Sequence, residues 1–122
     1  MRRGGLSVRR DLRINQGETW RHTEPIPELN SVGEPLVLTG ASVRGQIRAN
    51  AAGTVALHTW DTVEGNFELD TDARTVVLHV PANVSSDWSW TTGLWDLELT
   101  ESSGTTTRLA EGVTRVSPEI TR

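Results

Sequence analysis

Apolar residues recur at every second position in short segments along most of this chain. Trp95, Leu97 and Leu99 alternate with polar residues, and the same period of two runs from Val76 to Val80. Because successive side chains of a β-strand point to opposite faces, this alternation is typical of strands with one buried and one solvated face. Turn-forming residues separate such segments about every ten residues, which is typical of a β-sandwich or a small barrel.

The alternation predicts about eight short strands and no helix longer than the single turn that Pro81 can begin. The expected strands cover residues 12–15, 19–23, 43–48, 55–60, 67–69, 76–80, 95–100 and 105–116, with a further apolar run at 36–38. We therefore expect an all-β fold, either an antiparallel immunoglobulin-like β-sandwich or a partly closed barrel.

Prolines and a glycine set limits on two of these segments. Pro25 and Pro27 exclude a central strand, so residues 24–35 are expected to form a loop across an edge or end of the fold. Gly112 lies inside the last expected strand, where a glycine suggests a β-bulge. The pattern leaves open which face of that strand Leu109 occupies.

The basic residues, all of them arginine, are concentrated at the N-terminus. Arg2, Arg3, Arg9 and Arg10 fall within the first ten residues, which are rich in arginine and glycine and show no periodicity. Such a composition favours flexibility, so we expect residues 1–10 to form a flexible basic arm and residues 11–122 to form the β-sandwich domain. These four arginines are candidate partner-binding residues.

The rest of the chain is acidic, since the net charge of the whole is −4 despite this basic start. An acidic domain repels nucleic-acid phosphates, and no apolar run approaches the roughly 20 residues that span a bilayer, so neither nucleic acid nor a membrane is an expected partner. The absence of cysteine excludes disulfides and thiolate metal sites. No apolar segment of the secretory type follows the basic start, so we expect a protein made in the cytoplasm.

Residues with catalytic or metal-binding chemistry are present, but not in the spacings that such sites use. His22, His58 and His79 fall in separate expected strands, and no serine stands in a nucleophile motif. Asp70 and Asp72 can be read as calcium ligands, although short acidic residues are also ordinary turn formers. We therefore expect no catalytic, cofactor-binding or metal-binding residues, no cofactor, and no enzyme activity.

The aromatic content is unusual, because five tryptophans occur with one phenylalanine and no tyrosine. Trp95 is in phase with the apolar residues of its strand and is expected to anchor the core. Trp88 and Trp90 lie in a polar segment before the last hairpin, where they either close the end of the sandwich or contact a partner. We include both as candidate partner-binding residues. Trp60 together with this pair also permits a sugar-stacking role.

Three stretches, taken in order, carry a family resemblance. They are residues 11–20 (DLRINQGETW), residues 38–48 (LTGASVRGQIR), and the final hairpin, which runs from Trp95 through Ser103-Gly104 to residues 116–122 (VSPEITR). This pattern resembles the LtfC-like β-sandwich family of small tailed-bacteriophage proteins. It is also similar to the N-terminal domain of some baseplate upper proteins. The resemblance covers nearly the whole chain from Asp11, and its motifs are structural ones.

The resemblance implies a structural protein of a bacteriophage virion. The expected place is the tail, as a minor tail, baseplate or tail-fibre component, with assembly in the host cytoplasm. The expected partners are other virion proteins and further copies of the same chain, with the arm ordering against a neighbouring subunit. A head decoration or head–tail joining protein is the nearest alternative. A carbohydrate-binding module that contacts a host-surface glycan is the second alternative.

Overall fold

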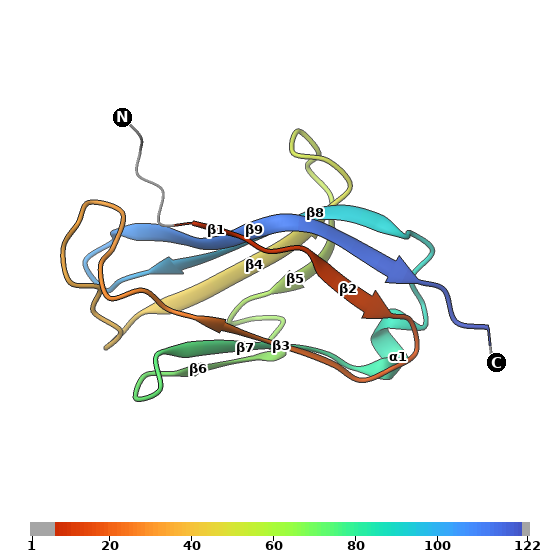
Figure 1. Cartoon of the computed structure of the whole chain (residues 1–122), viewed down its shortest axis with the longest axis horizontal. Coiled ribbons are helices and arrows are strands. Elements are labelled where there is room, and N and C mark those ends of the chain that lie inside the picture. Colours follow the sequence, from red (N-terminus) through yellow and green to blue (C-terminus); the bar gives the residue numbers. More distant parts are fainter. Residues whose placement is uncertain (1–6, 121–122) are drawn as a thin grey trace.

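A computed structural model describes residues 7–120 of the chain, and these residues fold almost entirely as β-strands (Figure 1). The elements are β1 (Val8–Arg9), β2 (Leu12–Asn15), β3 (Trp20–Pro25), β4 (Ser42–Arg48), β5 (Ala56–Trp60), β6 (Phe67–Asp70), β7 (Thr75–Val80), α1 (Ala82–Ser85), β8 (Thr92–Thr100) and β9 (Thr106–Ser117). Strands therefore form where the period of two predicts them, and α1 is the single helical turn expected after Pro81.

The strands form two sheets packed face to face. One sheet has six strands in the order β1-β9-β8-β4-β5, with β2 also paired to β9, and the other has three strands in the order β3-β7-β6. Figure 1 shows the six-stranded sheet above the three-stranded sheet, with α1 near one end between them. The two sheets remain separate, so the fold is an immunoglobulin-like β-sandwich and the barrel alternative is wrong.

The core lies between the sheets and is filled by the apolar half of each alternating strand. In β4, Val43 and Ile47 are buried while Arg44 is exposed, as the sequence pattern predicts. Trp60 is fully buried and its Nε1 donates a hydrogen bond to the His79 carbonyl, 2.9 Å away on the other sheet. Burying a large apolar side chain stabilises a fold by about 1.5–3 kcal/mol, and the core residues come from both sheets. Burial of this shared core holds the two sheets together.

The N-terminal segment corrects one domain boundary. Val8–Arg9 pairs in parallel with Ala110 and Glu111 of β9, so the sheet begins at Val8 and the prediction of a flexible arm up to residue 10 is wrong from that residue onward. Parallel pairing to β9 resumes along β2, from Leu12 to Asn15. Arg2, Arg3 and the rest of residues 1–6 lie outside the described residues.

Strand β9 contains one irregularity, and it differs from the one expected. The register of β8 against β9 shifts at Leu97/Glu98, which leaves Leu109 as the extra residue of a bulge with its side chain in the core. Gly112 is itself paired, with Trp95. The backbone of Arg10 passes so close to Gly112 that a Cβ atom there would overlap the Arg10 carbonyl oxygen. The glycine is therefore explained by the close approach of the Arg10 backbone, which joins β1 to β2.

The proline-containing segment is a loop after an edge strand, as predicted, although β3 extends to Pro25 before it begins. Leu36 and Leu38 belong to no strand, yet both are buried in the core. Within the described residues, no helix is long and apolar enough to cross a membrane.

Candidate functional site

The predicted partner-binding arginines have different environments. Arg9 is exposed, and its Nε donates to Asp11 Oδ1 at 3.0 Å. Arg10 instead points between the sheets, where its Nε and one terminal nitrogen donate to the two carboxylate oxygens of Glu24 at 3.0 and 2.8 Å. The two arginines are neighbours in sequence, but the Arg9 side chain is 69% exposed whereas that of Arg10 is 37% exposed.

Glu24 is the centre of a buried polar cluster that the sequence did not reveal. Its side chain is fully buried on the inner face of β3, and Nε2 of His22 lies 2.8 Å from its Oε1. The His22 ring stacks on Trp20 and meets Trp95 edge-on, with centroids 6.0 Å apart in both pairs. The Arg10–Glu24–His22 cluster therefore joins β3 to the N-terminal strands across one side of the sandwich.

The charges in this cluster favour ionised Glu24. Burial acts to raise the pKa of Glu24, but the hydrogen bonds from His22 and Arg10, together with their charges, outweigh it and leave the pKa below the usual value. The Glu24 carboxylate correspondingly raises the pKa of Arg10. A carboxylate held in this way acts as an ion-pair partner. With both oxygens engaged, we interpret the cluster as structural.

The predicted partner-binding tryptophans form an aromatic cluster at one end of the sandwich. Trp88 and Trp90 are half-buried against the core with centroids 4.6 Å apart, and Trp88 meets His58 edge-on at 5.5 Å. His58 in turn meets the fully buried Trp60 at 4.7 Å. Trp88 and Trp90 therefore pack at this end of the fold, and their role in partner binding stays a prediction. An exposed sugar-stacking role is wrong for Trp60.

His58 lies among these rings without a hydrogen-bond partner for its Nε2 in the described part of the chain. Burial lowers the pKa of His58 to about 4, because the charged imidazolium is poorly solvated there. The unfolded chain takes up this proton near pH 6.5, so the stability of the fold decreases as pH falls from 6.5 towards 4. We expect a loss of about 1 kcal/mol between pH 7 and pH 5, after discounting for the partial exposure of the ring.

Urea unfolding at pH 7 and pH 5 measures this loss. The H58F variant keeps an aromatic ring but cannot bind the proton, so its free energy of unfolding is expected to change less over the same interval. Equal changes in the native chain and in H58F would contradict a neutral His58 in the folded state.

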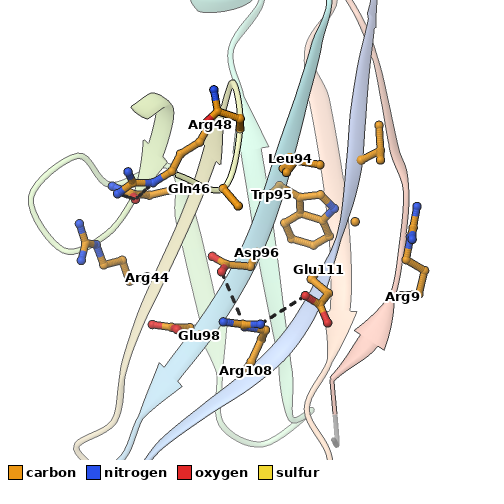
Figure 2. Close-up of a pocket in the computed structure, with 14 residues that line it drawn as sticks. Arg9, Arg44, Gln46, Arg48, Leu94, Trp95, Asp96, Glu98, Arg108 and Glu111 are labelled. Carbon is orange, nitrogen blue, oxygen red and sulfur yellow. Dashed lines mark hydrogen bonds and ion pairs between the residues drawn. The ribbon is translucent and has the colours of Figure 1, made fainter. Parts of the chain in front are cut away.

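A wide depression lies on the outer face of the six-stranded sheet, with a volume of about 690 Å³. Figure 2 shows its charged lining, which we call the charged face. The charged face consists of Arg9, Arg44, Arg48, Asp96, Glu98, Arg108 and Glu111. Arg44 and Arg48 lie on this outer surface because they alternate with the buried Val43 and Ile47 along β4.

Arg108 occupies the middle of the charged face. Its Nε lies 3.7 Å from Asp96 Oδ2, and one terminal nitrogen lies 3.3 Å from Glu111 Oε1. Arg48 donates instead to Gln46 Oε1 at 3.1 and 2.8 Å and to the Gly53 carbonyl. Arg108 is thus paired with acids of its own sheet, while Arg48 is fixed in place by neutral acceptors. An arginine that is held in place without a counter-ion is suited to binding a carboxylate from another molecule.

The acidic turn considered as a calcium site adopts ordinary turn geometry. Asp70 Oδ1 accepts hydrogen bonds from the backbone N–H groups of Asp72 and Ala73, at 3.1 and 2.9 Å. Residues 7–120 contain no group of three or more side chains placed to hold a metal ion. The turn chemistry explains why acids occur here.

Comparison with known proteins identifies the fold of this chain but not its function. No protein-family model matches the chain, and no curated protein matches it. Forty-two chains of solved structures match. One is a chicken T-cell receptor chain, with a TM-score of 0.55 and 14% sequence identity over 94% of this chain. The match spans 57% of that receptor chain. At this identity the likeness shows the immunoglobulin-like fold alone.

Proposed function

We propose that this chain is a structural protein of a tailed-bacteriophage virion, associated with the tail as a minor tail, baseplate or tail-fibre component. It acts by protein–protein assembly and not by catalysis. The observation that carries the proposal is the set of open sheet edges, because β5 in the six-stranded sheet and both β3 and β6 in the three-stranded sheet pair with one neighbouring strand each in the described fold. An open edge presents unpaired N–H and C=O groups to a strand of another chain. The family resemblance of the sequence supplies the viral context.

The same proposal covers the partners and the location. The chain joins other virion proteins and further copies of itself, and it is built into the particle in the host cytoplasm. A head decoration or head–tail joining protein would use the same open edges, so it is the nearest alternative. Stacking on host glycans is less favoured, because Trp60 is fully buried and Trp88 and Trp90 pack against the core.

The proposal assigns the N-terminal residues before Ser7, which include Arg2 and Arg3, to contact with a neighbouring subunit. Deleting residues 2–6 is expected to leave the melting temperature within about 2 °C of the native value. A shift of about 2 °C corresponds to roughly half a kcal/mol in the free energy of unfolding. The same deletion is expected to abolish incorporation into particles. Mass spectrometry of purified particles measures incorporation, with the native chain supplied in trans as the control.

A longer deletion serves as a second control. Removing residues 2–10 also removes β1 and the Arg10–Glu24 contact, so that variant is expected to melt at a lower temperature. Normal incorporation of the chain lacking residues 2–6 would contradict an assembly role for these residues. It would leave the proposal to rest on the open sheet edges.

A further inference from the structure

Charges on the outer face of the six-stranded sheet are arranged in rows. Strand β4 contributes Arg44 and Arg48, and the neighbouring strand β8 contributes Asp96 and Glu98. Strands β4 and β8 are antiparallel neighbours in which Arg44 stands directly opposite Glu98. One strand therefore carries a row of positive charge, and the adjacent strand carries a row of negative charge.

These rows are largely not neutralised within the chain. In residues 7–120, no ion pair is formed by Arg44, Arg48 or Glu98. Figure 2 shows the guanidinium groups of Arg44 and Arg48 gathered on the side of β4 away from Asp96, while Asp96 points towards Arg108. The exposed charges are consequently available to a second molecule.

Symmetry identifies the partner that fits such rows. Consider a two-fold axis that runs parallel to the strands and passes between β4 and β8. It places β4 of each molecule over β8 of the other, with Gln46 over Asp96 and Arg48 over Leu94. It also keeps residues at the same height along the strands, so Arg44 of one copy faces Glu98 of the other. An interface of this kind is isologous, and the Arg44–Glu98 contact occurs twice.

We propose that the charged face is a self-association surface, through which two copies of the chain pair about this axis. The partner is a second copy because one face supplies both halves of the charge pattern. Leu94 is 40% exposed on the same face, and its neighbour Val113 of β9 lines the same depression, so the interface also contains apolar area beside the charged rows. This inference concerns the surface and its symmetry, and it holds independently of the virion assignment.

Exchanging the charges at Arg44 and Glu98 tests this geometry directly. The R44E variant carries acids in both rows, and the E98R variant carries arginines in both rows. Each variant alone is expected to dimerise at least about tenfold more weakly than the native chain, because two attractions become two repulsions. An equimolar mixture of the two variants is expected to regain the native dissociation constant, and so is the double variant R44E/E98R. Sedimentation velocity at low salt measures each value.

The mixture separates contact between copies from effects within one chain. Each variant alters the pair of facing residues in its own chain, but mixing leaves that intrachain pair unchanged, so a gain on mixing reports contact between copies. A control variant with R21E, T23E and N83E, altered outside the charged face, changes the net charge twice as much and is expected to keep the native dimer. A native chain that stays monomeric up to about 1 mM would overturn the proposal, because a dissociation constant above this concentration corresponds to an association free energy weaker than about 4 kcal/mol. Failure of the mixture to associate would overturn it equally.

Discussion

Replacing Arg10 with alanine is expected to lower the free energy of unfolding by about 3 kcal/mol, because removing one partner of a buried ion pair leaves the other uncompensated. Glu24 is fully buried, and Arg10 donates to both of its oxygens. His22 remains as a partner in the variant, and the Arg10 side chain is 37% exposed, so the lower end of the range for buried pairs applies. Urea unfolding at pH 7 measures the change.

Arg9 provides the matched control for this variant. It is adjacent in sequence and also pairs with an acid, but both side chains of that pair are more than half exposed. Replacing Arg9 with alanine is expected to cost less than about 1 kcal/mol, the usual range for exposed ion pairs. Equal losses of unfolding free energy in the Arg9 and Arg10 variants would show that the burial of Glu24 does not determine the strength of its ion pair.

The pH dependence of the Arg10 variant is a second measure of the same contact. Because the pKa of Glu24 lies below its usual value, the folded state favours the ionised carboxylate more than the unfolded chain does. This contribution is present above the ordinary pKa of a glutamate and is lost as pH falls through the folded pKa. The native chain is therefore expected to lose more stability on acidification below pH 4.5 than the Arg10 variant loses.

Replacing Gly112 with alanine is expected to cost about 3 kcal/mol, the upper part of the range for overpacking. The added Cβ would overlap the Arg10 carbonyl oxygen and would lie 2.9 Å from Asp11 Oδ1. That carbonyl accepts a hydrogen bond from Trp95 Nε1 at 2.7 Å, so displacing it also breaks this contact. Urea unfolding measures the loss, and faster hydrogen exchange at the Arg10 amide would locate it in the N-terminal strands.

Gly53 is the control for the glycine substitution. Its added Cβ would lie 3.3 Å from Asn50 Oδ1, the atom nearest to it, in the turn between β4 and β5. Alanine there is expected to change the free energy of unfolding by less than about 0.5 kcal/mol, as for most surface substitutions. If Gly112→Ala proves equally mild, the close approach of the Arg10 backbone to Gly112 is contradicted.

The sequence was sufficient for most of the fold because the strands are amphipathic. In β4, and in β8 from Trp95 onwards, polar residues alternate with apolar residues or glycine, so both the strands and their buried faces were predictable. The bulge at Leu109 was not predictable, because it shifts the pattern by one residue and is defined by pairing with β8. The start of the sheet at Val8 was missed because β1 is two residues long and both are exposed.

The candidate sites were less predictable, because they depend on contacts between distant segments. Arg10 and Glu24 are 14 residues apart and meet across the two sheets. The one feature of the sequence that pointed to a buried Glu24 is its position, because it alternates with Trp20 and His22 and so lies on the same side of β3 as they do. Arg44 and Arg48 were visible as an outward row, whereas the opposing row on β8 became evident only from the register of the sheet.

The central claim, that this chain is part of a virion, is tested most directly by immunogold electron microscopy of intact particles of the phage that encodes it. We predict label on the tail, its tip or its fibres. Label on the head would keep the assembly role and move the chain to decoration or joining. The account would be contradicted by unlabelled particles whose mass spectrum also lacks the protein.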